Sequence, residues 1–296
     1  PSGAVSDVET LQDGKTVIYG GKKYQYNENI TTTLCIGVDQ ERFSEIDGVK
    51  GNNGQADALF LYALDTETGE STIIPISRDT MVDVDLYSAA GTYVSSSKQQ
   101  ICLAYAYGDG AHTSCENTVK SVQRIFYGLP INSYVAIDLK AIDVLSRKVG
   151  GVEVTPTESF TCLDYYFKKG QKVVLKGEKA RAFVQARDES KLDSNLNRMQ
   201  NQKQFINAFF SKALAKTKED ITFPVSVYNS ASKYMITDIT VSEISFLAGA
   251  VLKSGGNMKY CSIEGQTKMG EEFAEFYAND ESVYKTVIDV FYKPAA

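Results

Sequence analysis

Three short apolar segments in the first third of the chain have the length and composition of β-strands. The first, 32–38, is apolar from Leu34 onward and is typical of a strand buried on both faces of a sheet. The next two, 58–64 and 71–77, are separated by a polar segment that contains Gly69. A connection of this kind predicts an antiparallel hairpin. These segments are therefore expected to form the centre of a sheet.

An alternating pattern lies nearer to the N-terminus, where β-forming residues at 15–19 and 22–26 flank Gly20 and Gly21. A Gly-Gly pair between such segments predicts a two-residue hairpin. We therefore expect an N-terminal arm over residues 1–30 and a main domain over residues 31–296.

Apolar residues at helical spacing predict two helices in the middle of the chain. The first begins at Thr113, which has capping-box spacing to Glu116, and ends before Gly128. The second is capped by Asp138 and ends at a Gly-Gly pair before a short strand at 152–154.

Two more helices are predicted farther on, a short one at 177–185 and a long one from about 197 to 216, with a polar loop between them. The C-terminal extension, 216–296, mixes short strands and helices and is expected to pack on the same sheet. Strands that alternate with helices predict an α/β fold, a layered α-β-α domain in which a central mixed β-sheet is flanked by helices.

The predicted hairpin has a consequence for charged residues at the ends of its strands. If residues 64 and 71 face each other, the antiparallel register places Asp57 opposite Arg78. If the strand at 32–38 lies alongside and parallel to 71–77, Asp39 joins them. We therefore expect a cluster of charged side chains at one edge of the sheet.

Composition and charge narrow the classes of function. The 296 residues are 43% hydrophobic and 23% charged, which is typical of a globular protein. A net charge of −6 argues against a nucleic-acid partner. No apolar run reaches the roughly 18–20 residues that span a membrane. Because the chain opens with Pro1 and not Met, we expect an N-terminal portion, including any membrane anchor, to precede it.

The cysteines and the histidine offer little chemistry. Five cysteines without closely spaced pairs fit neither a disulfide framework nor a zinc site. A single disulfide between Cys102 and Cys115 is an alternative that the spacing allows. The single histidine, His112, has no partner serine or cysteine in the pattern and is interpreted as a loop or cap residue.

Arginine is scarce, with seven residues against 24 lysines, and planar recognition of phosphate or carboxylate groups favours arginine. Arg78, Arg187 and Arg198 each lie at the end of a predicted element beside a polar loop. The alternative is that they form ordinary surface ion pairs with Asp79 and Asp188.

One face of the long predicted helix combines polar and apolar groups. Arg198, Gln202, Phe205 and Phe209 share that face, with the cation and the amide near the start of the helix. This pattern suits a ligand that is anionic at one end and apolar at the other. The alternative is that the arginine and the glutamine lie on the solvated rim of a core helix.

Six short motifs in order resemble those of the LytR-CpsA-Psr family, over residues 31 to about 215. They are Leu34-Cys-Ile-Gly-Val-Asp39, Gly54-Gln-Ala-Asp57, Ile76-Ser-Arg-Asp-Thr80, Ala104-Tyr-Ala-Tyr-Gly108, Val149-Gly-Gly-Val152 and Ala186-Arg187 through Arg198-Met-Gln-Asn-Gln202. Proteins of this family are membrane-anchored on the outer face of mainly Gram-positive bacteria. They transfer wall teichoic acid, capsule or similar glycopolymers from a polyprenyl-pyrophosphate carrier to peptidoglycan.

The resemblance implies roles for individual residues. Asp39 and Asp57 match magnesium-binding aspartates of the family. Without the resemblance, two aspartates at the ends of strands would be a weak indication of a metal site, because aspartates that cap helices or strands give the same pattern. Arg78 matches a pyrophosphate ligand. Arg187 and Arg198 match arginines on the far side of the phosphates. The residues expected to contact substrate are Gln55, Asp79, Gln185, Gln202, Phe205 and Phe209.

This chain departs from the family pattern at two arginine positions. Gln55 stands where the family has arginine before its Ser/Thr-Asp pair, and Gln185-Ala-Arg187 stands where the family has R-x-R. The proline of the family's I-P-R-D segment is displaced to Pro75. Each charge-assisted hydrogen bond replaced by a neutral one gives up on the order of 1 kcal/mol of binding free energy.

The expected function is therefore a magnesium-assisted phosphotransferase that moves a glycopolymer to peptidoglycan, with one of the two aspartates accepting the proton. The glutamines at 55 and 185 keep an alternative open, a non-catalytic module that binds polyprenyl phosphates. A polyprenyl-pyrophosphate pyrophosphatase is a third possibility. The resemblance further implies a monomer on the extracellular face of the cytoplasmic membrane.

Overall fold

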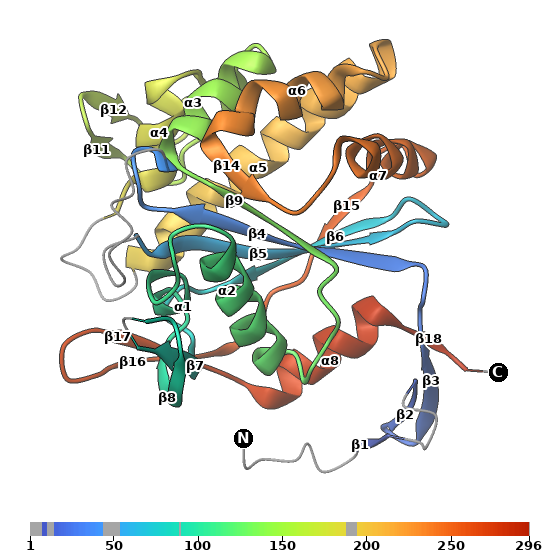
Figure 1. Ribbon diagram of the computed structural model, residues 1–296. Coiled ribbons are helices and arrows are strands. Elements are labelled where there is room, and N and C mark those ends of the chain that lie inside the picture. The colour runs from blue at the N-terminus through green and yellow to red at the C-terminus, as the bar shows by residue number, and fades with distance from the viewer. Residues whose placement is uncertain (1–7, 11–14, 44–53, 89, 188–193, 296) are drawn as a thin grey trace.

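A mixed six-stranded sheet forms the centre of the molecule (Figure 1). The computed structural model describes residues 8–10, 15–43, 54–88, 90–187 and 194–295. The strand order is β14-β9-β4-β5-β6-β15. The bounds of these strands are β4 Ile30–Val38, β5 Ala56–Asp65, β6 Ser71–Ile76, β9 Ser133–Ile137, β14 Met235–Thr237 and β15 Met258–Tyr260.

Helices cover both faces of this sheet, which confirms the predicted three-layer α/β architecture (Figure 1). One face carries α3 (Leu139–Lys148), α4 (Glu178–Gln185), α5 (Ser194–Glu219), α6 (Phe223–Ala231) and α7 (Val241–Lys253). The other face carries α1 (Leu103–Ala106), α2 (His112–Ile125) and α8 (Asp280–Phe291). None of the helices in the described residues is both long and apolar enough to cross a membrane.

Smaller sheets surround this core. An N-terminal sheet has the order β1-β2-β3-β18, with β1 Val8–Thr10, β2 Thr16–Tyr19, β3 Lys22–Tyr26 and β18 Tyr292–Pro294. Two-stranded sheets are formed by β7 (Met81–Tyr87) with β8 (Tyr93–Gln100), β10 (Val152–Val154) with β13 (Val173–Leu175), β11 (Phe160–Cys162) with β12 (Tyr165–Phe167), and β16 (Gly265–Met269) with β17 (Ala274–Ala278).

The two predicted hairpins are confirmed. Tyr19 pairs with Lys22 across Gly20 and Gly21, and both glycines adopt the positive φ angles that this tight turn requires. The C-terminal extension also packs on the main sheet as expected, because β14 and β15 form its two edges.

The register between β5 and β6 is also as predicted, with Leu64 opposite Ser71. The expectation that the first buried strand lies directly beside 71–77 is wrong. That strand, β4, pairs antiparallel with the other side of β5, so β5 separates it from β6. Because β4 and β6 both run antiparallel to β5, they share a direction, and the ends carrying Asp39 and Arg78 still lie at the same edge.

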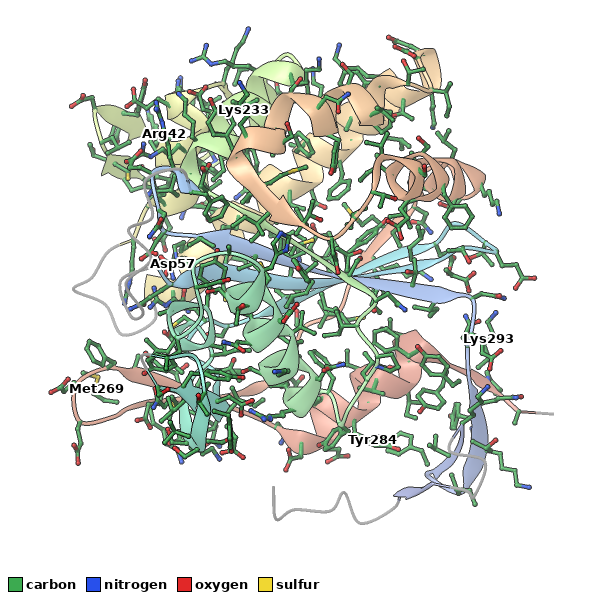
Figure 2. The ribbon with its side chains drawn as sticks, in the orientation of Figure 1. Arg42, Asp57, Lys233, Met269, Tyr284 and Lys293 are labelled. Atoms are coloured by element: carbon green, nitrogen blue, oxygen red, sulfur yellow. The ribbon has the colours of Figure 1, made fainter. Side chains whose placement is uncertain are left out.

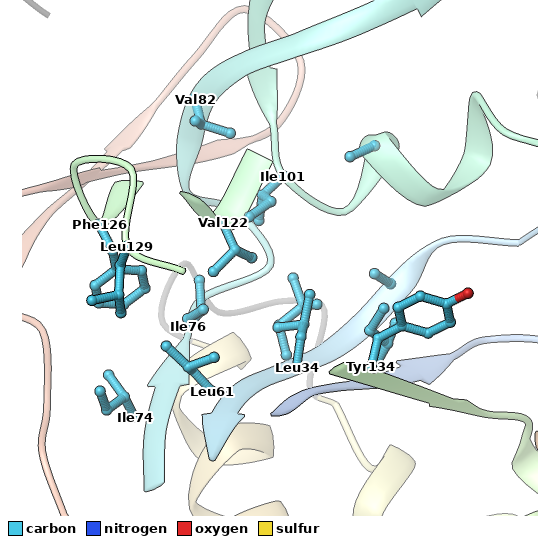
Figure 3. Packing of buried hydrophobic residues seen from close by; sticks show 14 of the residues in the cluster. Leu34, Leu61, Ile74, Ile76, Val82, Ile101, Val122, Phe126, Leu129 and Tyr134 are labelled. Carbon is cyan, nitrogen blue, oxygen red and sulfur yellow. The ribbon is translucent and has the colours of Figure 1, made fainter. Parts of the chain in front are cut away.

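Alternation along the central strands gives the two faces of the sheet different surroundings. Leu34 on β4 and Leu61 on β5 are fully buried in a core with α2 and α8, and the same cluster includes Ile101, Val122 and Phe126 (Figure 3). The intervening side chains point to the opposite face, where Cys35, Phe60 and Tyr62 line a cavity beneath α5, α6 and α7.

Two helix boundaries differ from the predictions. The capping box at Thr113 and Glu116 does not form, because α2 already begins at His112 and its first N–H groups turn to Asp109. The long helix begins at Ser194, not near 197, and ends at Glu219. Asp138 caps α3 as predicted, accepting a hydrogen bond from the Ala141 N–H at 2.8 Å.

All five cysteines carry free thiols, so the bridge between Cys102 and Cys115 does not form. His112 donates or accepts a hydrogen bond at Nδ1 with the Tyr134 hydroxyl, 2.7 Å away, at the start of α2. This placement agrees with its interpretation as a residue at a helix start.

The cap of α2 makes a testable contribution to stability. Asp109 Oδ1 accepts hydrogen bonds from the N–H groups of Ala111 at 2.8 Å and Ser114 at 3.1 Å. Partial burial alone would raise the pKa of Asp109, but these N–H groups outweigh it and hold the pKa below its ordinary value. Asp109→Ala is therefore expected to lower the free energy of unfolding by about 1 kcal/mol at neutral pH.

Because the pKa of Asp109 is lowered in the folded state, this difference should be complete above the unfolded-state pKa of about 3.9. It should disappear as the pH falls through the lower folded-state value. Urea denaturation of both proteins at several pH values measures it. Glu116→Ala is the control, and a comparable loss of stability in that variant would show that the predicted capping box forms after all.

Candidate active site

Three polar residues meet at one end of the central sheet, as the strand register predicts. Asp39 directly follows β4, Asp57 lies near the start of β5, and Arg78 follows the end of β6. Figure 2 places Asp57 at this end of the sheet. The antiparallel pairing of β5 with its two neighbours brings these ends together.

The carboxylate of Asp57 lies between two arginines. Arg78 Nη1 donates to Asp57 Oδ1, and Arg198 Nη1 donates to Asp57 Oδ2 at 2.7 Å. The first arginine comes from the end of β6 and the second from α5, so one carboxylate connects the sheet to the long helix. Arg198 is only 4% exposed, which rules out the solvated-rim alternative for this residue.

Asp79 is also part of this cluster and accepts hydrogen bonds from two amide side chains. Its carboxylate accepts a hydrogen bond from Asn195 Nδ2 at 2.8 Å and another from Gln100 Nε2 at 3.3 Å. Asn195 Oδ1 in turn accepts from Arg198 Nη2 at 2.8 Å. Sequence reasoning missed Asn195 because it placed that residue in a loop before the helix. The signal that could have found it is its i, i+3 spacing to Arg198.

Gln55 connects the arginine cluster to Asp39. Its side-chain oxygen accepts from Arg78 Nη2, and its backbone N–H donates to Asp39 Oδ1 at 2.5 Å. Partial desolvation raises the pKa of Asp39, the Gln55 N–H opposes this, and the negative charge of Asp57 adds to the rise. The two aspartates are therefore close enough to influence each other.

The cluster has unused capacity to bind an anion. The Nε atoms of Arg78 and Arg198 are buried without a hydrogen-bond partner within the described residues, although Arg78 Nε also forms an ion pair with Asp79 Oδ1 at 3.6 Å, as the alternative for Arg78 predicted. Burial lowers the pKa of Arg198, and the charge of Asp57 opposes that shift. Burial also raises the pKa of Asp79, which Arg78 and the Asn195 amide oppose. Buried cations with open donors are the chemistry that binds phosphate oxygens.

One predicted substrate contact, Gln185, is engaged with another side chain, and Arg187 lies near the cluster. The side chain of Gln185 accepts a hydrogen bond from Arg181 Nε at 2.8 Å within α4, and Arg181 also forms an ion pair with Glu41. Arg187 is exposed just beyond α4, and its charge still reaches Asp79 and Arg198. The proposed surface pairing of Arg187 with Asp188 falls outside the described residues.

An apolar cavity of about 450 Å³ adjoins the cluster, between the sheet and the helices α3 to α7. Its wall includes Phe205, Phe209 and Gln202 from α5, which confirms that the predicted polar and apolar face of this helix lines a slot. Volumes of this size are typical of ligand sites and are not left by ordinary core packing.

The cavity and the arginine cluster are adjacent. A small cleft of about 20 Å³ is lined by Asp57 and Arg78, and it shares Ala58, Phe60 and Gln202 with the large cavity. Gln202 therefore lies between the two, where its Nε2 contacts the Val184 carbonyl at 3.5 Å. A ligand that reached from the cavity into the cleft would place one end beside the Arg78 guanidinium.

Asp39 and Asp57 could bind a divalent cation only together with oxygen atoms supplied by a ligand. In the part of the chain that the structure describes, no three His, Cys, Asp or Glu side chains gather into a metal site. Asp39 and Asp57 supply two carboxylates, and Mg²⁺ commonly takes one or two carboxylates together with phosphate oxygens and water. The oxygen donors present therefore fit Mg²⁺ in the company of a phosphate.

Solved structures share this architecture. The crystal structure of Bacillus subtilis TagV has a TM-score of 0.67 and 25% identity, covering 89% of this chain and 97% of that one. A protein from Streptococcus agalactiae has a TM-score of 0.72 and 19% identity, covering 88% and 86%. TagT bound to LI-WTA has a TM-score of 0.65 and 18% identity, covering 89% and 90%. The last two comparisons show the fold alone.

Relatives known by sequence point the same way. The polyisoprenyl-teichoic acid–peptidoglycan teichoic acid transferase TagU of Enterococcus faecalis is 24% identical over 247 residues, 82% of this chain and 74% of the relative. The TagV transferase of Bacillus subtilis is 29% identical over 201 residues, 66% of this chain and 47% of the relative. The LytR_cpsA_psr family model matches residues 3–288. Since that match spans nearly the whole chain, the protein belongs to the LytR_cpsA_psr family.

Proposed function

We propose that this protein is a cell-envelope enzyme that transfers a glycopolymer from a polyprenyl-pyrophosphate carrier to peptidoglycan. The observation that carries the proposal is a large apolar cavity beside a small cleft lined by Arg78 and Asp57, with Ala58, Phe60 and Gln202 in the wall of both. A pyrophosphate joined to a long apolar chain has the same two parts in the same order. Relatives whose names specify teichoic acid transfer from a polyisoprenyl carrier support this substrate pair.

The chain's own residues would act mainly through charge. Arg78 and Arg198 would turn their open Nε donors to the pyrophosphate, and exposed Arg187 would approach it from the far side. An acceptor hydroxyl of peptidoglycan would attack the phosphorus next to the sugar. The bond from that phosphorus to the bridging oxygen would break, releasing polyprenyl phosphate. Arginines in a water-poor site stabilise the charge that develops on the leaving phosphate.

We also propose that Asp39 and Asp57 hold Mg²⁺ together with phosphate oxygens. When bound, the cation would neutralise part of the charge of the pyrophosphate. The support is the closeness of the two carboxylates, since the charge of Asp57 raises the pKa of Asp39. One of these aspartates would accept the proton of the acceptor hydroxyl.

The proposed acceptor, peptidoglycan, lies outside the cytoplasmic membrane, and the proposed carrier is a lipid of that membrane. We therefore place the protein at the outer face of that membrane. This location also agrees with the cell-envelope activity in the names of the relatives.

Removing a guanidinium should abolish most of the transfer. Arg78→Ala is expected to lower the transfer rate by about 10²- to 10³-fold, because one fixed donor to the developing charge is lost. The assay follows a labelled lipid-pyrophosphate glycan onto peptidoglycan fragments. Arg124→Ala is the matched control, because Arg124 pairs with Asp85 away from the site.

Full activity of Arg78→Ala would contradict the proposal. If the unmodified protein binds the lipid and transfers nothing, the non-catalytic binding module is the better description. If it releases a glycan phosphate to water, it is a pyrophosphatase, and product analysis separates the two outcomes.

Filling the cavity should separate recognition of the tail from recognition of the head group. Ala248 lines the cavity from α7, so Ala248→Trp is expected to weaken binding of a long-chain prenyl pyrophosphate by about tenfold or more, through lost apolar burial. Binding of inorganic pyrophosphate should be unchanged. Isothermal titration calorimetry measures both, and equal affinity of the variant for the long-chain ligand would show that the cavity does not hold the tail.

Loss of one carboxylate should weaken the metal site. Asp39→Asn is expected to raise the Mg²⁺ concentration that half-saturates the protein by about tenfold, since charge count and ligand number set affinity at such sites. Thermal unfolding with inorganic pyrophosphate and increasing Mg²⁺ provides a readout independent of activity. Asp83→Asn, at an exposed aspartate of β7, is the control. Identical titrations of Asp39→Asn and the unmodified protein would remove Asp39 from the site.

A further inference from the structure

The helices α6 and α7 lie at the surface, yet their central turns carry no charge. Within α6 there is no charged residue, and within α7 the charged residues are Glu243 in the first turn and Lys253 at the end. Glu243 is engaged in the capping box with Thr240. A surface helix of a water-exposed domain normally has a charged outer face. The side of each helix that faces the cavity has to be apolar. The outer side does not, and its lack of charge therefore needs another explanation.

Large apolar side chains are exposed on this part of the molecule. Phe246 on α7 is 61% exposed, and Ile221 in the turn between α5 and α6 is 60% exposed. Neither side chain lines the cavity. The inner sides of the same elements do line it, through Leu247 beside Phe246 and Phe223 beyond Ile221. The cavity and the exposed residues thus lie on opposite sides of one thin layer of helices.

Charged residues of both signs lie near these apolar groups. Lys212, Lys216 and Lys218 lie in the last turns of α5 and Lys253 ends α7, while exposed Glu219 and Asp220 directly precede Ile221. The Lys216 ammonium lies 5.5 Å from the centre of the Phe223 ring, at the end of the cavity farthest along α5. We call the outer sides of α6 and α7, the α5–α6 turn and these lysines the roof surface.

We propose that the roof surface docks on the anionic lipid bilayer, so that a prenyl chain passes from the membrane into the cavity beneath. This inference rests on the proposed function, which makes the bilayer the source of the apolar chain. Exposed apolar side chains within a rim of lysines are typical of segments that lie at a membrane surface. Docking there spares the prenyl chain a passage through water, which is unfavourable for every methylene group exposed.

The arrangement also orients the reaction. The cavity runs from Phe223, near the roof surface, to Gln202 beside the arginine cluster. A chain that enters beneath α6 and α7 would bring its pyrophosphate toward the end of the sheet that carries Asp57 and its partner Arg78 (Figure 2).

Vesicle binding by the full 296-residue chain tests this surface directly. The probe is flotation with vesicles of equal parts phosphatidylcholine and phosphatidylglycerol. Phe246→Glu and Ile221→Glu are each expected to weaken binding by about tenfold, because a charge replaces an apolar anchor. Binding should also fall with added salt and with pure phosphatidylcholine, because the lysine rim acts through charge.

Phe273→Glu is the matched control. Phe273 is 65% exposed in the β16–β17 connection, whose residue Met269 lies on the other side of the sheet from α6 and α7 (Figure 2). This variant should bind vesicles as the unmodified protein does. Circular dichroism and thermal unfolding of all three variants establish that they are folded.

A second measurement separates this inference from the proposed function. A short-chain, water-soluble prenyl pyrophosphate should bind equally to the unmodified protein and to both roof variants, because neither residue lines the cavity. If the unmodified protein binds vesicles through Phe246 and Ile221 but binds no prenyl pyrophosphate, the proposed function is wrong and the docking surface stands.

Vesicle binding that is absent, or unaffected by both roof substitutions, would overturn the docking surface. So would gel filtration showing that the substitutions split a dimer, since the roof surface would then contact a second copy of the chain.

Discussion

The carboxylate of Asp57, held between Arg78 and Arg198, is the interaction on which the arrangement of the site depends. It connects the end of the central sheet to a helix far along the chain. Charges this close to the interior are costly unless each is paired and hydrogen-bonded. Asp79 and Asn195 complete the pairing, and the Nε atom of Arg198 is left buried without a hydrogen bond to any described residue.

The same contact determines what the rest of α5 can do. With Arg198 held at the end of the sheet, the next turns of the helix pass over the sheet face and present Gln202, Phe205 and Phe209 to the cavity. The side chains that line this cavity of about 450 Å³ are nearly all apolar, so an apolar occupant would remove their surface from water.

The opposite face of the sheet shows why such a cavity is tolerated. Leu34 and Leu61 pack without exposure against α2 and α8, and this solid core stabilises the strands. Alternation along β4 and β5 sends their other side chains into the cavity wall. One face of the sheet thus supplies stability, and the other is available for a ligand.

Local signals in the sequence were sufficient for much of this protein. Strand and hairpin patterns determined the register that brings Asp57 to Arg78, and helical spacing determined the face that carries Arg198 and Phe205, because both depend on near neighbours in the chain. Only the tertiary structure decided the rest. It placed β5 between β4 and β6, turned Gln185 toward Arg181, and recruited Asn195 and Gln100 to Asp79. It also gave the slot predicted along the face of α5 its volume of about 450 Å³ and its walls from α3, α4, α6 and α7. These outcomes depend on contacts between residues far apart in the chain. The periodicity of a segment shows which face of it is apolar, but it does not determine which distant residue a side chain contacts or how large a space is left between two elements.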